Sequence, residues 1–531
     1  MLKLLFVCCI LMGFATISNS LSILLIEGVP SISHHVWTMN LVKGLLLKGH
    51  HVHVVSIRET NIKGKLGQNL TYAVFDNIVE AMQEDEEYNP AEWEGYSVFR
   101  MIHFIYEWFT EASEKIIETK GAKELVEMIK KVEFDVIVQD ITIPESFYGL
   151  WEIAKGKPPV VGYTPYGAIP WLKDFTGGSH YSNVRSYPYK DLAKPISLWE
   201  RTLNALYYVV DNFIRHYYHL PISQQFAEQY IGHKLRPLHE MEKNISIILI
   251  NSYSAFEPGI PLPPNVIEIG GLHAQTAGEE TVTYPDSIRE FLDGAENGAV
   301  IISLGTNVKW KSLGLDKLKA VTLALAKLKQ RVLWKLDIEM PFEVPNNMMI
   351  VKWLPQNEIL SHKNVKAIWT HGGLLSTQEA IWKGVPVIGM PFFADQKFNV
   401  ALLVHKGTAV QVDIKTLSKE SVLGAFEEIL YNESYTKNMK KLSSEFRDRP
   451  VPPLDLAVWW IEYAVRHPHG SLESPLRSQS WVEQNLIDIY AFLLFILIII
   501  LLIVIFVLKK LYNFCRNRVC TTSKLQKKKQ M

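Results

Sequence analysis

Short apolar runs alternate with longer amphipathic stretches along most of this 531-residue chain. Short runs rich in β-branched residues are typical of buried strands, and the longer stretches between them have helical spacing. This rhythm predicts βαβ units and mainly parallel sheets. The expected strands are residues 22–26, 51–56, 136–138, 160–163, 247–250, 300–304, 331–334, 348–351, 365–369, 385–390 and 409–412.

A proline-rich segment, residues 257–264, interrupts the pattern near the middle of the chain. It can sustain neither a helix nor a strand ladder, because proline has no backbone N–H. We therefore predict a linker here, between domains at residues 21–256 and 265–455, and the chain is long enough to bury two cores. An amphipathic helix within the next segment, residues 456–488, is expected to fold back on the first domain.

The two ends of the chain carry apolar segments of different kinds. Residues 1–20 have one lysine, an apolar run and a small-residue end, the pattern of a cleaved signal peptide. Residues 489–508 are twenty residues without a charge, which is long enough to cross a bilayer as a helix. The tail, residues 509–531, has eight Lys or Arg and no acidic residue, so we expect it to be cytoplasmic and the bulk of the chain to be lumenal.

Charge and cysteine usage agree with this layout. The net charge is zero, but removal of the tail and Lys3 leaves 46 Lys and Arg against 55 Asp and Glu. A mildly acidic body gives no reason to expect nucleic acid as a partner. All four cysteines lie in the signal or the tail, so the body has none. The sequons at Asn69, Asn244 and Asn432 become candidate glycosylation sites, and which of them are used stays open.

The most informative segment runs from Trp353 to Gln396. In it, the strand at 365–369 leads into Thr-His-Gly-Gly and then a helix over about 376–382, stopped by Gly384. Such a turn aims free backbone N–H groups and the positive end of a helix dipole at one point, which suits a diphosphate. A Gly-Gly turn is common in α/β proteins, so this signal is weak alone.

Other polar and aromatic residues of this segment suit the rest of a nucleotide. Trp353 follows the strand at 348–351 and can stack on a base, although a tryptophan alone is more often part of a core. Gln356 can bond a base edge or a ribose hydroxyl. Glu379 lies eight residues, about two helical turns, after His371 and can accept from two ribose hydroxyls.

Taken together, residues 353–396 resemble the signature of the UDP-glycosyltransferases. The resemblance implies an α/β fold of the GT-B type, with two Rossmann-like domains facing a cleft and a C-terminal transmembrane helix. It implies that Trp353 stacks on uracil, that Gln356 contacts the nucleoside, that His371 and Gly373 meet the diphosphate, and that Glu379 holds the ribose. Many relatives have Asn where this chain has Leu375, so Ser376 is expected to bind phosphate instead. The remaining implied donor contacts are Asp395 and Gln396, on the sugar, and Ser303, Gly305 and Thr306, in a phosphate-contacting turn.

The first half must then supply a base for the acceptor hydroxyl. His34 and His35 follow the first strand, before a helix expected over about 36–48, and the family motif falls on His34. A catalytic imidazole needs a carboxylate behind it, and Asp140, at the end of the strand at 136–138, occupies the place of the family's partner aspartate. Asp135 lies at the opposite edge of the sheet and is expected to be a solvated turn residue.

We therefore expect an inverting hexosyltransferase that uses UDP-glucose or UDP-glucuronate as co-substrate and a small lipophilic acceptor. The resemblance places part of the acceptor pocket in residues 171–230. No metal site and no required cofactor is expected, since the chain has no Asp-x-Asp, CxxC or HxxxH pattern. The final Lys-Lys-Gln-Met resembles a signal for return to the endoplasmic reticulum. The alternatives are a non-catalytic nucleotide-sugar-binding membrane protein and a Rossmann oxidoreductase, although no GxGxxG opens either half. Donor sugar, acceptor and a homo-oligomeric state stay open.

Overall fold

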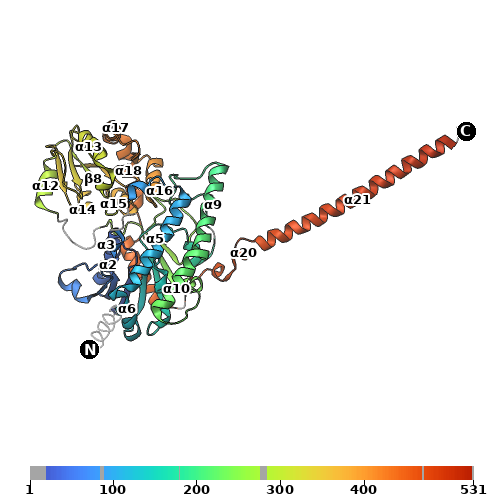
Figure 1. The fold of residues 1–531 in the computed structure, drawn as a ribbon, viewed down its shortest axis with the longest axis horizontal. Coiled ribbons are helices and arrows are strands. Elements are labelled where there is room, and N and C mark those ends of the chain that lie inside the picture. Colours follow the sequence, from blue (N-terminus) through green and yellow to red (C-terminus); the bar gives the residue numbers. More distant parts are fainter. Residues whose placement is uncertain are drawn as a thin grey trace, which may run out of the picture. The chain divides into compact units, whose positions relative to one another are not determined.

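The computed structural model describes residues 20–83, 89–178, 180–275, 284–468, 470 and 472–528 (Figure 1). Nearly all of the expected signal peptide and the end of the tail lie outside these residues. The described chain forms two compact units. The first contains the residues up to Phe175 and from His180 to Glu473, and the second contains the short segment that begins at Thr176 and the chain from Ser474 onward.

The first sheet of the larger unit has seven parallel strands in the order β3-β2-β1-β4-β5-β6-β7. These strands are β1 (Ser22–Ile26), β2 (His51–Ser56), β3 (Leu70–Val74), β4 (Val136–Asp140), β5 (Val160–Thr164), β6 (Ile245–Ile250) and β7 (Val266–Glu268). The helices of eight or more residues in this part are α2 (Ile32–Leu47), α5 (Val98–Glu118), α6 (Lys120–Lys131), α9 (Leu198–Ile214) and α10 (Leu220–Ile231).

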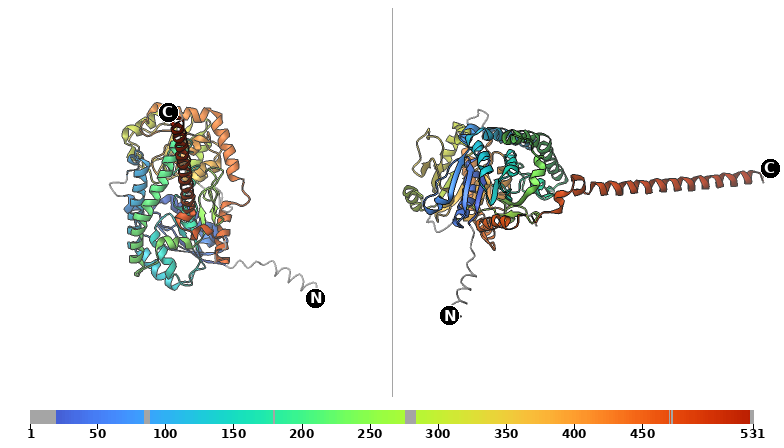
Figure 2. Two further views of the ribbon diagram at one scale, coloured as in Figure 1. Left: turned by 90° about the vertical axis from the view of Figure 1, so that its right-hand side faces the viewer. Right: turned by 90° about the horizontal axis from the view of Figure 1, so that it is seen from below.

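Helices cover both faces of this sheet (Figure 2) because alternate strand residues point to opposite sides. In β1, Leu24 and Ile26 belong to the core formed with α5 and α6, whereas Ile23 and Leu25 belong to the core formed with α2. The second core also contains the buried face of α19 (Pro453–Arg466). Helix α19 thus packs against α2 and the first sheet in the structure.

The second sheet has six parallel strands in the order β10-β9-β8-β11-β12-β13. The strands are β8 (Ala299–Ser303), β9 (Arg331–Lys335), β10 (Met348–Val351), β11 (Val365–Thr370), β12 (Val387–Gly389) and β13 (Ala409–Gln411). The helices of eight or more residues around it are α12 (Asp286–Asp293), α13 (Leu315–Leu325), α15 (Leu374–Lys383), α16 (Gln396–His405), α17 (Lys419–Tyr431) and α18 (Glu433–Arg447). This sheet also has a core on each face, and the two parallel sheets confirm the expected α/β architecture.

The structure differs from the sequence prediction at two strands of the first sheet and at one helix beside it. Strand β3 was not expected, because an edge strand with only partly buried residues lacks a continuous apolar run. Strand β7 follows the proline-rich segment yet pairs with β6, so the chain returns to the first sheet before it crosses to the second. Helix α2 begins at Ile32 rather than near Val36, because Ser31 is the last extended residue before it.

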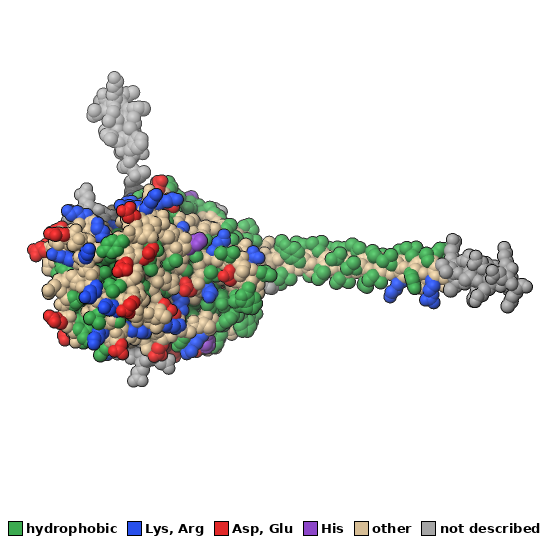
Figure 3. Space-filling model, turned by 90° about the horizontal axis from the view of Figure 1, so that it is seen from above, with side chains coloured by type: hydrophobic (Ala, Val, Ile, Leu, Met, Phe, Trp, Pro, Cys, Tyr) green, Lys and Arg blue, Asp and Glu red, His purple; other side chains and the backbone are tan. Residues whose placement is uncertain are grey.

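The smaller unit contains α21 (Ile487–Lys528), a helix that includes the predicted transmembrane segment. Among the described residues it is the one helix long and apolar enough to cross a membrane, over the 31 residues Ile487–Asn517. Hydrophobic side chains cover this helix, and Lys or Arg side chains are visible only toward its far end (Figure 3).

Candidate active site

A cavity of about 420 Å³ lies between the two sheets of the larger unit. Its walls come from the loops and helix ends that follow the carboxyl ends of the strands, where ligands of α/β folds bind. All but one of the site residues expected from the sequence line it: His34, Ser303, Gly305, Thr306, Trp353, Gln356, His371, Gly373, Ser376, Glu379, Asp395 and Gln396. The exception is Asp140, which lies behind His34.

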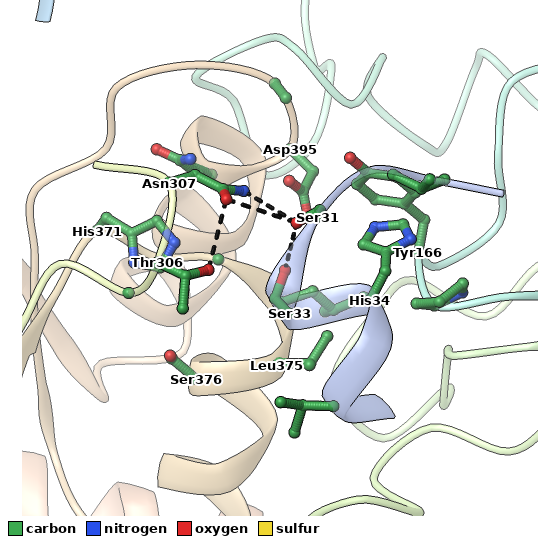
Figure 4. A pocket seen from close by; sticks show the side chains of 18 of the residues that line it. Ser31, Ser33, His34, Tyr166, Thr306, Asn307, His371, Leu375, Ser376 and Asp395 are labelled. Carbon is green, nitrogen blue, oxygen red and sulfur yellow. Dashed lines mark hydrogen bonds between the residues drawn. The ribbon is translucent and has the colours of Figure 1, made fainter. Parts of the chain in front are cut away.

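His34 lies on the first turn of α2, and its imidazole lies next to Tyr166 (Figure 4). Its ring packs edge-to-face against Tyr166, with a centroid distance of 4.8 Å. The helix begins two residues before His34, so the imidazole is carried by a regular backbone element rather than by a loop. A reactive group on a rigid element can be held accurately against a substrate.

Asp140 is buried at the end of β4 and is directed at His34. Its Oδ2 lies 3.7 Å from Nδ1 of His34, and its Oδ1 accepts a hydrogen bond of 2.8 Å from the backbone N–H of Thr142. Neither Oδ2 nor the His34 Nδ1 has a hydrogen-bond partner within the described residues, although both are buried. A shift of less than 1 Å would join them, which matches the tendency of catalytic hydrogen bonds to tighten when substrate binds.

His35 has a different environment, which separates the roles of the adjacent histidines. Its Nδ1 lies 2.8 Å from Oε2 of Glu27, and its Nε2 lies 2.6 Å from the Thr60 hydroxyl. Burial raises the pKa of Glu27, and the hydrogen bond from His35 opposes that rise. Both nitrogens of His35 are occupied and its ring does not line the cavity, so this side chain links Glu27 and Thr60 within the first domain.

Two glycines form a close-fitting enclosure around the His371 imidazole. A Cβ atom at Gly305 would lie 2.5 Å from Cε1 of this ring, and one at Gly373 would lie 2.5 Å from its Nε2. Gly305 also has a φ of +75°, a conformation that other residues rarely adopt. Burial and then the charge of Lys335 lower the pKa of His371 to about 3. The ring is therefore neutral near pH 7 and keeps one N–H to donate.

Replacement of Gly373 by alanine is expected to displace His371 and to destabilise the second domain. Overpacking of this kind costs about 1–3 kcal/mol, and urea unfolding monitored by circular dichroism would measure it. The matched control is Gly424→Ala in α17, where a Cβ meets nothing within 4 Å and helix propensity favours alanine. Equal stability of the Gly373 variant and the original protein would contradict the close fit.

Gln356, Ser376 and Glu379 are connected by hydrogen bonds. The Gln356 side-chain amide donates to Oε2 of Glu379 at 2.6 Å and to the Ser376 hydroxyl at 2.9 Å. Ser376 still has its own hydroxyl proton to donate. Burial raises the pKa of Glu379 to about 7. The Trp353 side chain beside this cluster is 59% exposed, so it does not belong to a core and its ring is available for stacking.

Asp395 and Gln396 lie at the start of α16, and Asp395 lies near His34 (Figure 4). Burial raises the pKa of Asp395 to about 6, while the hydrogen bond from Asn399 and the charge of His34 oppose the rise. The amide oxygen of Gln396 accepts from the backbone N–H groups of Phe392 and Phe393, at 2.9 and 3.3 Å. The side-chain NH₂ group of Gln396 therefore remains available to donate to a ligand.

The structure adds residues to the site that sequence reasoning missed. Lys335 is the last residue of β9 and lines the cavity. Its place at the end of a strand, between two strands whose following loops were already predicted to bind the donor, could have marked it as a site residue. Asn307 donates a hydrogen bond of 3.2 Å to the Ser31 hydroxyl and so links the loops of the two domains (Figure 4). No sequence pattern marked this pair, because its members are 276 residues apart.

The apolar wall of the cavity also differs from the expectation. It is formed by Met82, Trp93, Phe104, Ile105, Trp108 and Phe109, from α3 (Ile78–Gln83), α4 (Pro90–Trp93) and α5. Residues 171–230, expected to form part of an acceptor pocket, contribute none of its described lining. Trp171 and Tyr189 instead line a much smaller neighbouring hollow beside Asp395.

The family model described as "UDP-glucoronosyl and UDP-glucosyl transferase" matches residues 24–525. The chain belongs to this UDP-glycosyltransferase family. UDP-glucosyltransferase 2 of Dactylopius coccus is 29% identical over 492 residues, which cover 90% of each chain. UDP-glucuronosyltransferase 2B17 of Homo sapiens is 32% identical over 412 residues, which cover 76% of this chain and 74% of that protein.

Solved structures place the fold of this UDP-glycosyltransferase in the GT-B class. The glycotransferase of kitacinnamycin has a TM-score of 0.57 at 16% identity, and spinosyn forosaminyltransferase SpnP has a TM-score of 0.55 at 17% identity. Each match covers 84% of this chain and 99% of the other. At this level of identity the likeness establishes the fold, and the site itself must be argued from the residues of this chain.

Proposed function

We propose that this UDP-glycosyltransferase moves a hexose from a UDP-sugar to a hydroxyl of small lipophilic acceptors, with inversion at the anomeric carbon. His34 takes the proton of the acceptor hydroxyl as its oxygen bonds to C1 of the sugar. The bond between C1 and the β-phosphate oxygen breaks, and its electron pair leaves with UDP. Asp140 stabilises the imidazolium that forms.

The observation that carries this proposal is the shared cavity. An imidazole backed by a buried carboxylate comes from the first domain, and a glycine-rich turn, an exposed indole and a carboxylate come from the second. In this arrangement Trp353 stacks on uracil, Glu379 and Gln356 hold the nucleoside, and Ser303, Thr306, His371 and Ser376 meet the diphosphate. The sugar then lies at Asp395 and Gln396, next to His34.

A direct assay tests the reaction and its stereochemistry. The full chain in membranes is incubated with radiolabelled UDP-sugars and a panel of phenols and steroids, and NMR determines the anomer of the product. An α-linked donor should give a β-linked product. UDP binding without transfer to any acceptor would favour the alternative of a non-catalytic nucleotide-sugar-binding protein. A retained α configuration would contradict the single displacement.

The lining of the cavity favours glucose over glucuronic acid as the transferred sugar. Among the described lining residues, the Lys and Arg side chains are those of Lys43 and Lys335. Lys335 lies between the Trp353 ring and the phosphate turn at Gly305, and Lys43 is nine residues, or about 13 Å of helix, beyond His34. Arg185 lies in the smaller hollow beside Asp395, but Glu257 holds it in an ion pair of 2.6 Å. A glucuronate carboxylate would therefore lie next to Asp395 without a cation.

We expect UDP-glucose to be used at least about tenfold more efficiently than UDP-glucuronate, because an unpaired carboxylate beside Asp395 is electrostatically unfavourable. A competition assay with equal concentrations of the two donors and one phenol acceptor measures the ratio of kcat/KM. Preference for UDP-glucuronate would show that a cation reaches the sugar in the bound state. Asp395→Asn should reduce the ratio of kcat/KM for UDP-glucose to that for UDP-glucuronate, since it removes the negative charge that repels the glucuronate carboxylate.

The layout of the chain supports a proposal for its location. An apolar helix that can span a membrane precedes a basic tail, and a signal-like sequence begins the chain. We infer a single-pass type I protein of the endoplasmic reticulum with both catalytic domains in the lumen. Asn69, Asn244 and Asn432 are then the sequons available for glycosylation, and a mobility shift on endoglycosidase treatment would test the orientation.

A further inference from the structure

Lys335 is a charged residue inside the cavity that forms no ion pair with an acidic residue of the described chain. It is partly buried, and its side chain lines the same cavity as His34 and His371. The carboxylate that acts on its charge is Asp337, whose Oδ1 already accepts a hydrogen bond of 3.0 Å from the backbone N–H of Trp310. A desolvated ammonium without a close anionic partner is unfavourable unless a ligand supplies one.

The strand order places Lys335 between the two elements that frame the nucleotide. Strand β9 lies between β8, which leads into the turn at Gly305, and β10, which leads to Trp353. The Lys335 ammonium donates a hydrogen bond to the carbonyl of Gly305 and lies 5.4 Å from the centroid of the Trp353 ring. Its charge therefore lies at the junction of the phosphate turn and the aromatic platform.

The Lys335 charge also acts on His371, which lies on the other side of the turn at Gly305. After burial, the Lys335 charge is the second cause that lowers the pKa of His371. Lys335, at the end of β9, and His371, directly after β11, lie on either side of β8, and both side chains approach Gly305 in the turn that follows β8. Among the described lining residues the other Lys or Arg, Lys43, belongs to α2 of the first domain.

We propose that Lys335 is the cation that binds the diphosphate of the UDP-sugar and stabilises the leaving UDP. This assignment rests on the function proposed above. When the bond between C1 and the β-phosphate oxygen breaks, its electron pair stays on that oxygen and increases the negative charge of the diphosphate. A partly buried ammonium held in place by its hydrogen bond to Gly305 can stabilise this charge without the reorganisation that water would need. The proton of the acceptor stays on His34, so the positive charge gained by the imidazole equals the negative charge gained by the departing UDP.

Calorimetry with a series of ligands tests the assignment on the full chain in detergent. Uridine, UMP and UDP share the base and ribose but differ in phosphate charge. Lys335→Gln is expected to weaken UDP binding by roughly tenfold, UMP binding by less and uridine binding hardly at all, because one charge-assisted contact to phosphate is lost. A purely structural role, in which Lys335 only holds Gly305 and Trp353 in place, would weaken all three ligands equally and would overturn the proposal.

Two further variants make the result unambiguous. Lys352→Gln removes an exposed lysine next to Trp353 that does not line the cavity, and it should leave all three affinities unchanged. Lys335→Arg keeps the charge and should preserve the ratio of UDP to uridine affinity within about twofold, even if the glutamine variant misfolds. A collapsed ratio in the arginine variant would count against the assignment.

The same experiment separates this assignment from the proposed function. Failure of the unmodified protein to bind UDP at all would overturn the function and with it the role of Lys335. Normal UDP binding by both the unmodified protein and Lys335→Gln would overturn only the role of Lys335. A lower kcat with UDP-sugar at saturating donor, together with the selective loss of UDP affinity, would support both parts of the assignment.

Discussion

His34→Ala is expected to reduce glycosyl transfer by about a hundredfold to ten-thousandfold, the range typical for loss of a positioned general base. The acceptor hydroxyl is a weak nucleophile until its proton is removed, and the described cavity offers no other imidazole backed by a buried carboxylate at this position. UDP affinity should change little, because the nucleotide is held by residues of the second domain. Transfer rates with a radiolabelled donor and calorimetry with UDP measure the two quantities.

The neighbouring histidine provides the matched control for this prediction. His35→Asn removes the contacts with Glu27 and Thr60 and should lower the melting temperature, but folded protein should retain transfer. Asp140→Asn should lower the rate while leaving UDP affinity intact, since it weakens support for the imidazolium. Full transfer activity in the His34 variant would refute the assignment of the base, and loss of transfer in folded His35→Asn alone would move it to the adjacent residue.

Glu379→Ala is expected to weaken UDP binding by about a hundredfold, because one carboxylate would hold two ribose hydroxyls through charge-assisted hydrogen bonds. The change also removes the acceptor for Gln356, which keeps its bond to Ser376. Glu379→Ala should weaken the binding of uridine as much as that of UDP, since the ribose is common to both ligands. Lys335→Gln, in contrast, should weaken mainly the binding of UDP. Equal UDP affinity in Glu379→Ala and the unmodified protein would remove the ribose role.

The same residue should make donor binding dependent on pH. Burial raises the pKa of Glu379 from 4.5 to about 7 in the ligand-free protein. A carboxyl whose pKa is higher in the folded than in the unfolded state contributes stability at low pH, and this contribution is lost as pH rises through 7. The ionised form accepts from the ribose more strongly, so UDP affinity should increase between about pH 6 and pH 8. Glu379→Gln should flatten this dependence, and calorimetry across the range would measure it.

Much of the donor side could be predicted from local sequence. The turn at His371, the glycines beside it and the position of Glu379 two turns along the next helix all lie within one short segment, so spacing and backbone propensity specify them. Trp353 was ambiguous between core and ligand platform, and its exposure in the structure favours the platform. The family resemblance added the roles, and the family match confirms the recognition.

The acceptor side could be predicted less well, because its residues converge from distant parts of the chain. The edge strand β3 and the late addition of β7 to the first sheet depend on pairing between strands, for which a single strand gives no signal. The apolar wall comes from α3, α4 and α5 rather than from residues 171–230, because helix packing decides which of many aromatic residues reach the cavity.

The order of apolar runs, the glycine and proline positions and the uncharged segment near the carboxyl end were enough to establish an α/β protein with a membrane-spanning candidate and a nucleotide turn. These features are local, so each can be read from neighbouring residues. The family motif pointed to His34, and tertiary packing gave the physical distinction, because the His35 ring meets Glu27 and the His34 ring lies beside Asp140. It also brought Lys335 to Gly305, 30 residues earlier, since β9 must pair with β8 before an ammonium at the end of one strand can meet the turn after the other.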